Sequence, residues 1–162
     1  MLVRFKKQDF ELITQSELSQ KCFEPLIDFY KREVTKNSNF TQFREQFYEQ
    51  LSEGQRALFM FYSYYGHANK SLIEFYWWSA YYMAQPKSWL ALKAGMKYFK
   101  DESTLLLLEE IELLLKEHNH PDKLEAFTIT RDELDQNKEL QASFKSLYAI
   151  FKYTSSIFKN NK

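Results

Sequence analysis

Hydrophobic residues recur every three or four positions along most of this chain, a spacing that places them on one side of an α-helix. The clearest series begins after Asn39, a residue suited to cap a helix, and consists of Phe40, Phe43, Phe47 and Leu51. Similar spacing predicts further helices over residues 16–36, 86–99, 101–117 and 130–158. Pro25 lies inside the first of these, so we expect a kink or a restart there.

The two segments in the middle of the chain are apolar on nearly every side, which is typical of helices in the centre of a domain. The first starts at Ser52 and the second at Ser71, and each serine is followed three residues later by Gln or Glu, as in a capping box. Gly66 suits the left-handed position just past a helix end. We therefore expect a helical hairpin that turns over residues 66–70.

These patterns predict a single compact all-α domain of six or seven helices around the central aromatic hairpin. A length of 162 residues suits one domain, and only three glycines and three prolines leave room for long helices. Residues 1–14 fit irregular chain, a short strand or a loose helix. The single cysteine, Cys22, allows no intrachain disulfide, and we expect a buried thiol.

Aromatic residues make up 18% of the chain, which raises the question of a membrane anchor. The longest uncharged runs, residues 57–69 and 75–86, are shorter than the roughly 20 apolar residues that span a bilayer. The first residues also lack the apolar run of a signal peptide. We therefore predict no membrane partner and a cytoplasmic location.

The hairpin also carries polar side chains that can line an aromatic pocket. The candidate pocket residues are Arg56, Tyr64, Tyr65, His67, Glu74, Trp77 and Trp78. A half-buried charge is costly unless paired, so we favour structural or capping roles for Arg56 and Glu74. Antiparallel helices would hold these two charges about 15 Å apart. We therefore expect Glu74 to accept from the Ser71 backbone amide and Arg56 to find another carboxylate.

Charge is balanced overall, with 22 basic and 22 acidic residues, but it is unevenly distributed. Residues 101–139 hold 12 acids and 4 bases. Within this segment Glu109, Glu110 and Glu112 are predicted to point outward. We favour the interpretation that they form a solvated helix face, and the alternative is a patch that binds a basic protein partner. His118 and His120 are interpreted as part of a solvated loop rather than as metal ligands.

Residues 51–78, LSEGQRALFMFYSYYGHANKSLIEFYWW, resemble the core motif of the bacterial DNA-mimic-protein-like family, whose members are mostly of unknown function. The family pattern Leu-Ser/Thr-x-Gly-Gln-Arg is matched by Leu51, Ser52, Gly54, Gln55 and Arg56, and its later part by Asn69, Phe75 and Tyr76. Lys70 and Ser71 replace two family glycines. The resemblance implies an all-helical fold and, for some members, occupation of a DNA-binding partner. A net charge of zero argues against mimicry by the whole surface.

No phosphate-binding loop, nucleophile elbow or zinc-protease motif is present, so we predict no catalytic residue, no cofactor and no metal. The aromatic residues lie in apolar helices without interleaved cations, which argues against direct nucleic-acid binding. We predict a small cytosolic protein that binds an unidentified protein as an inhibitor, immunity-type protein or regulator. The alternative is a small-molecule-binding domain or enzyme that uses an aromatic pocket near residues 56–89. An open aromatic cavity would favour the alternative.

Overall fold

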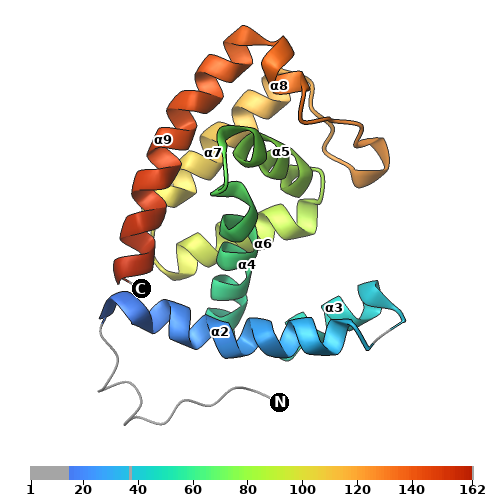
Figure 1. Cartoon of the computed structure of the whole chain (residues 1–162), viewed down its shortest axis with the longest axis vertical. Coiled ribbons are helices and arrows are strands. Elements are labelled where there is room, and N and C mark those ends of the chain that lie inside the picture. Colours follow the sequence, from blue (N-terminus) through green and yellow to red (C-terminus); the bar gives the residue numbers. More distant parts are fainter. Residues whose placement is uncertain (1–14, 37, 162) are drawn as a thin grey trace.

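A helical arm and a helical body make up the described part of the chain, residues 15–36 and 38–161 of a computed structural model (Figure 1). The arm consists of α2 (Gln15–Val34) and α3 (Phe40–Glu49). The body contains α4 (Glu53–Ala68), α5 (Leu72–Met83), α6 (Pro86–Tyr98), α7 (Glu102–Glu117), η1 (Leu124–Ala126), α8 (Glu133–Gln136) and α9 (Lys138–Asn161). These two ranges contain no strand, which confirms the all-α prediction. They hold eight α-helices rather than six or seven, because the predicted last helix is divided by the single turn of α8.

Polar caps start the helices where the sequence predicted them. Asn39 accepts from the backbone amide of Gln42 at the start of α3. Ser52 and Gln55 form a complete capping box at the start of α4. Ser71 accepts from the backbone amide of Glu74. Each cap satisfies a backbone donor that has no partner inside its helix.

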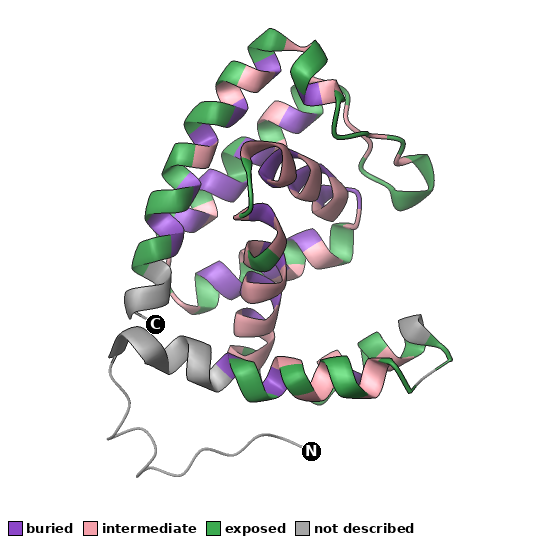
Figure 2. Ribbon diagram, in the orientation of Figure 1, coloured by how far each residue is buried: buried purple, intermediate pink, exposed green. Residues whose placement is uncertain are grey.

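The central hairpin is buried as predicted. Phe75 and Tyr76 are 0% exposed, and Ala80 is 1% exposed. The ring of Phe75 stacks on Phe151 of α9 with centroids 4.8 Å apart. Figure 2 shows that buried residues gather on the sides of α6, α7 and α9 that face α4 and α5. Two helices that are apolar on nearly every side are therefore enclosed by the rest of the body.

Gly66 does not end α4, which corrects the expectation from the sequence. The helix continues to Ala68, and Asn69 follows it in a right-handed helical conformation. No glycine among the described residues has a positive φ. Phe61, Tyr64 and Ala68 lie on the buried face of α4, so the burial of Ala68 extends the helix beyond the glycine.

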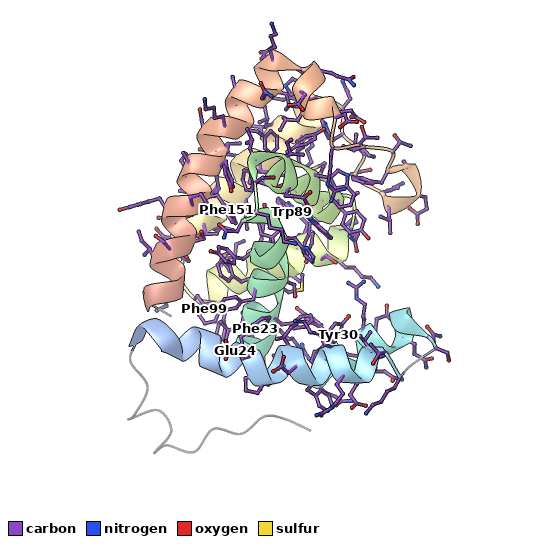
Figure 3. All side chains as sticks on the ribbon, in the orientation of Figure 1. Phe23, Glu24, Tyr30, Trp89, Phe99 and Phe151 are labelled. Atoms are coloured by element: carbon purple, nitrogen blue, oxygen red, sulfur yellow. The ribbon has the colours of Figure 1, made fainter. Side chains whose placement is uncertain are left out.

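The arm packs on the first half of α4 and has a small core of its own. Leu26, Phe47 and Leu51 form this core, with Phe59 of α4 against it. The helix α2 passes through Pro25 as one element. Phe23 and Tyr30 lie on the side of α2 that faces the body (Figure 3). The predicted alternatives for residues 1–14 and the predicted burial of the Cys22 side chain fall outside the described residues.

Gly66 and Gly95 form a matched pair for a stability test. A methyl group at Gly66 would meet no atom within 4 Å, whereas one at Gly95 would lie 3.1 Å from Cα of Ala57. Gly66→Ala should raise the free energy of unfolding by about 0.5–1 kcal/mol, because alanine loses less backbone entropy in a helix. Gly95→Ala should lower it by about 1–3 kcal/mol, because α4 and α6 must move apart. Urea denaturation measures both, and destabilisation by Gly66→Ala would contradict a helical Gly66.

Candidate functional site

A groove lies between the arm and the body, and we call it the arm groove. It consists of two cavities of about 670 Å³ and 570 Å³. They share the lining residues Tyr30, Arg44, Phe59, Met60, Gln85 and Ser88. The larger cavity extends to the α5–α6 turn and to residues 123–125, and the smaller one extends along α4 to Trp78. Each cavity is in the size range of sites that bind small molecules.

Aromatic side chains from both the arm and the body line the arm groove. The ring of Tyr30 from the arm packs edge-on against Phe59 of α4, with centroids 5.3 Å apart. On the body side, Trp78, Tyr81 and Tyr82 line the smaller cavity. The His67 ring stacks on Trp78 with centroids 3.8 Å apart. Aromatic side chains from the arm and from the body therefore both contribute to the lining of the groove.

Three hydrogen-bond donors line the smaller cavity, and two of them, Arg44 and Tyr30, also line the larger one. The side chain of Arg44 makes no hydrogen bond or ion pair with another described residue. Burial raises the pKa of Tyr30, and it raises that of Tyr82 to about 12. The charge of Arg44 acts to lower both pKa values, and all three side chains line the smaller cavity. Both phenols therefore carry their protons at neutral pH and can donate.

The lining of the arm groove carries more positive than negative charge. The smaller cavity is lined by Lys31 and Arg44, and none of its described lining residues is a carboxylate. In the larger cavity Lys87 and Lys123 join Arg44, against two glutamates. Burial and the charge of Lys70 lower the pKa of His67, so this ring is neutral at pH 7. The groove is suited to a ligand with an apolar body and negative charge.

Only two of the residues predicted to line a pocket, His67 and Trp78, line this groove. Tyr64 is 2% exposed and hydrogen-bonds with the hydroxyl of Ser79 at 2.6 Å, so it belongs to the core. Tyr65 stacks on Phe61. Phe151 of α9 packs against both Tyr64 and Tyr65, with ring centroids 5.8 Å and 6.0 Å away, so these two residues do not line the arm groove. The open side of the hairpin faces the arm.

Arg56 fastens the arm to the body instead of lining a pocket. Its Nε donates to the carbonyl of Tyr48 at 3.0 Å and its Nη2 to that of Glu49 at 2.8 Å. The guanidinium also lies 5.3 Å from the centre of the Tyr48 ring. The prediction that Arg56 pairs with a carboxylate is wrong, because the C-terminal carbonyls of α3 supply acceptors and a negative partial charge.

Glu74 binds residues other than Ser71, which corrects the second expectation for this pair. Its carboxylate accepts from Trp78 Nε1 at 2.8 Å and from Arg131 Nε at 2.6 Å. Arg131 also lies over the Trp77 ring, 4.2 Å from its centre. Trp77 in turn donates to the Ile129 carbonyl at 3.0 Å. Arg56 and Glu74 thus have separate partners, as their predicted separation requires, and Glu74 anchors the segment that carries residues 123–125 to the groove.

The three candidate glutamates of α7 differ in their surroundings. Glu109 and Glu110 are exposed, as predicted. The side chain of Glu112 is only 21% exposed and pairs with Lys93 at 2.5 Å and with Lys116 at 2.6 Å. Trp89 also donates to it at 2.8 Å. The prediction that Glu112 belongs to an outward patch is wrong, because α6 supplies partners that draw it inward.

The histidines of the loop after α7 also have different surroundings. Nε2 of His120 lies 2.8 Å from the hydroxyl of the buried Tyr76, so the interpretation of a solvated loop is wrong at His120. Burial lowers the pKa of this histidine. The described residues contain no group of three His, Cys, Asp or Glu side chains that can hold a metal ion. Among the described helices none has the length and apolar character to cross a membrane.

Three lining residues of the arm groove, Tyr30, Arg44 and Tyr82, were not predicted from the sequence. They come from three helices, and no spacing in the sequence connects them. No protein-family model, no curated protein and no solved structure matches the chain. The resemblance to the DNA-mimic-protein-like family therefore stays a prediction.

Glu112 gives a prediction for the dependence of stability on pH. Burial raises its pKa, but hydrogen bonds from Lys116, Lys93 and Trp89 outweigh burial and lower the pKa to about 2. A carboxyl group with a lowered folded-state pKa stabilises the fold above its usual pKa of 4.5, and this stabilisation is lost as the pH falls towards 2. Glu112→Gln should therefore cost about 1–3 kcal/mol at pH 7, and the difference from the unmodified protein should shrink below pH 4.5.

Urea denaturation from pH 7 to pH 3 measures this difference. Glu110→Gln on the exposed side of the same helix is the control, with little expected effect at any pH. A loss in Glu112→Gln that stayed constant with pH would contradict the role of the carboxylate charge.

Proposed function

We propose that this protein binds a small, mainly apolar ligand in the arm groove. The observation that carries the proposal is the groove itself, whose larger cavity has a volume of about 670 Å³ and whose lining includes Tyr30, Tyr48 and Phe59. Sites for small molecules are typically concave and apolar, with a few polar groups that orient the ligand. Arg44, Tyr30 and Tyr82 supply such groups here. The open aromatic cavity favours the small-molecule alternative that the sequence left open.

Binding, rather than a reaction, is what the groove residues support. A guanidinium and neutral phenols can hold and orient a ligand, but they form no activated nucleophile. The lining residues Ser63 and Ser88 make no hydrogen bond to a histidine or carboxylate of the described chain. We therefore assign these residues to binding and propose no catalytic residue.

A second candidate function, binding of a protein partner, is supported by the outer face of α7. Leu106 and Leu113 are 59% and 60% exposed, and they stand one turn before and one turn after Glu109 and Glu110. Residues three, four and seven apart share one side of a helix. The two leucines and two glutamates therefore form an acidic amphipathic face, suited to a basic partner with apolar side chains. An inhibitory, immunity-type or regulatory role in the cytoplasm is consistent with such binding.

A tryptophan placed in the groove tests the first proposal. Ser88 lines both cavities, so Ser88→Trp should fill the space where they join. The neutral fluorescent probe N-phenyl-1-naphthylamine should bind the unmodified protein saturably at one site, and Ser88→Trp should weaken this binding at least about tenfold. Ser103→Trp, at an exposed position on α7, is the matched control and should bind like the unmodified protein. Equal binding by Ser88→Trp, or no saturable binding at all, would refute the proposal.

Charge reversal on α7 tests the second candidate. Purified tagged protein should capture a basic protein from native cell extract at physiological salt. The double variant Glu109→Lys/Glu110→Lys should lose that protein, because both changes place cations opposite a basic surface. Asp122→Lys/Asp132→Lys makes the same change in net charge at exposed positions outside α7 and should retain it. Identical capture by both double variants would exclude the α7 face.

A further inference from the structure

We infer that the arm groove selects apolar molecules that carry a small oxyanion, a carboxylate or sulfonate, and that Arg44, Tyr30 and Tyr82 bind this head group. The inference rests on the proposed function of the groove and adds the chemical class of its ligand. It follows from three side-chain donors that line the smaller cavity and have no hydrogen-bond acceptor among the described residues.

Arg44 is the centre of this head-group site. It lines both cavities, and no carboxylate of the described residues pairs with it. Arg56 and Arg131 of the same protein do have their acceptors, two backbone carbonyls and Glu74 respectively. A guanidinium presents a planar set of donors that matches the two oxygens of a carboxylate. An unpaired guanidinium beside an apolar groove is therefore suited to an anionic ligand.

The phenols of Tyr30 and Tyr82 complete the site. Neither hydroxyl makes a hydrogen bond to another described residue. All three side chains line the smaller cavity, and Arg44 and Tyr30 also line the larger one. A neutral phenol can donate its proton to an oxyanion without repelling it. A guanidinium and two hydroxyl donors therefore face the same space.

The surrounding charges decide between an anionic and a cationic ligand. Aromatic walls alone also suit a cation, which is attracted to ring faces. Lys31 and Arg44 line the smaller cavity, however, and its described lining contains no carboxylate to offset them. Glu45, which follows Arg44 in α3, and Glu125 line only the larger cavity. A cationic ligand would be repelled by the lining of the smaller cavity, whereas an anionic head group gains there and its apolar body extends along the aromatic side chains.

Two fluorescent probes that differ only by a sulfonate test the inference. They are 8-anilinonaphthalene-1-sulfonate and the neutral N-phenyl-1-naphthylamine, and both are titrated into the unmodified protein and its variants. Arg44→Gln should weaken binding of the sulfonate probe at least about tenfold, because it removes a charge-assisted hydrogen bond, and should change binding of the neutral probe by no more than about twofold. Tyr82→Phe should weaken binding of the sulfonate probe about threefold or more, and it should change binding of the neutral probe by no more than about twofold.

Arg44→Lys and Arg32→Gln are the matched variants. Arg44→Lys keeps the charge and should recover part of the binding of the sulfonate probe. Arg32 is an exposed arginine of the arm that lines neither cavity, so Arg32→Gln should leave both probes unchanged. If Arg44→Gln bound the sulfonate probe as well as the unmodified protein does, or if it weakened binding of both probes equally, the inference would be overturned. The proposed function would still be upheld by saturable binding of the neutral probe to the unmodified protein. Failure of the neutral probe to bind the unmodified protein would instead overturn both.

Discussion

The burial of two helices that are apolar on nearly every side is the constraint on which this structure depends. Phe75 and Tyr76 of α5 and Phe61 and Tyr64 of α4 have almost no exposed surface. Such helices lower their free energy only when other elements surround them. The helices α6, α7 and α9 pack around α5, and α6 and the arm helix α2 pack against α4 (Figure 1).

The arm groove is a consequence of this arrangement. The larger cavity is lined by residues of the arm helices α2 and α3, by α4, and by the α5–α6 turn, α6 and residues 123–125. The aromatic surface between them is partly covered and partly open to ligand. A single helix such as α4 therefore serves two purposes, because one part of its surface completes the core and another forms the floor of the groove.

Polar side chains divide into those with partners and those that face the groove. Arg56 holds the end of α3, Glu74 holds Arg131, and Glu112 joins α6 to α7. These partly buried charges have good geometry and stabilise particular contacts between elements. Arg44, Tyr30 and Tyr82 have comparable donors but no acceptor among the described residues. The difference separates the residues that build the structure from those available to bind a ligand.

Local spacing in the sequence was sufficient to place the helices, their caps and the buried hairpin. The reason is that helix formation and capping involve residues within three or four positions of each other, as for Ser52 with Gln55. The predictions were wrong where a distant residue supplied a better partner. Glu74 binds Arg131, which lies 57 residues later, and Glu112 binds Lys93 of another helix. The spacing in the sequence predicts that Arg44 lies on the polar side of an amphipathic helix. Only the packing of α2 on α3, and of the arm on the body, places Arg44, Tyr30 and Tyr82 around one cavity. The position of one helix on another depends on the shapes and charges of surfaces that are far apart in the chain.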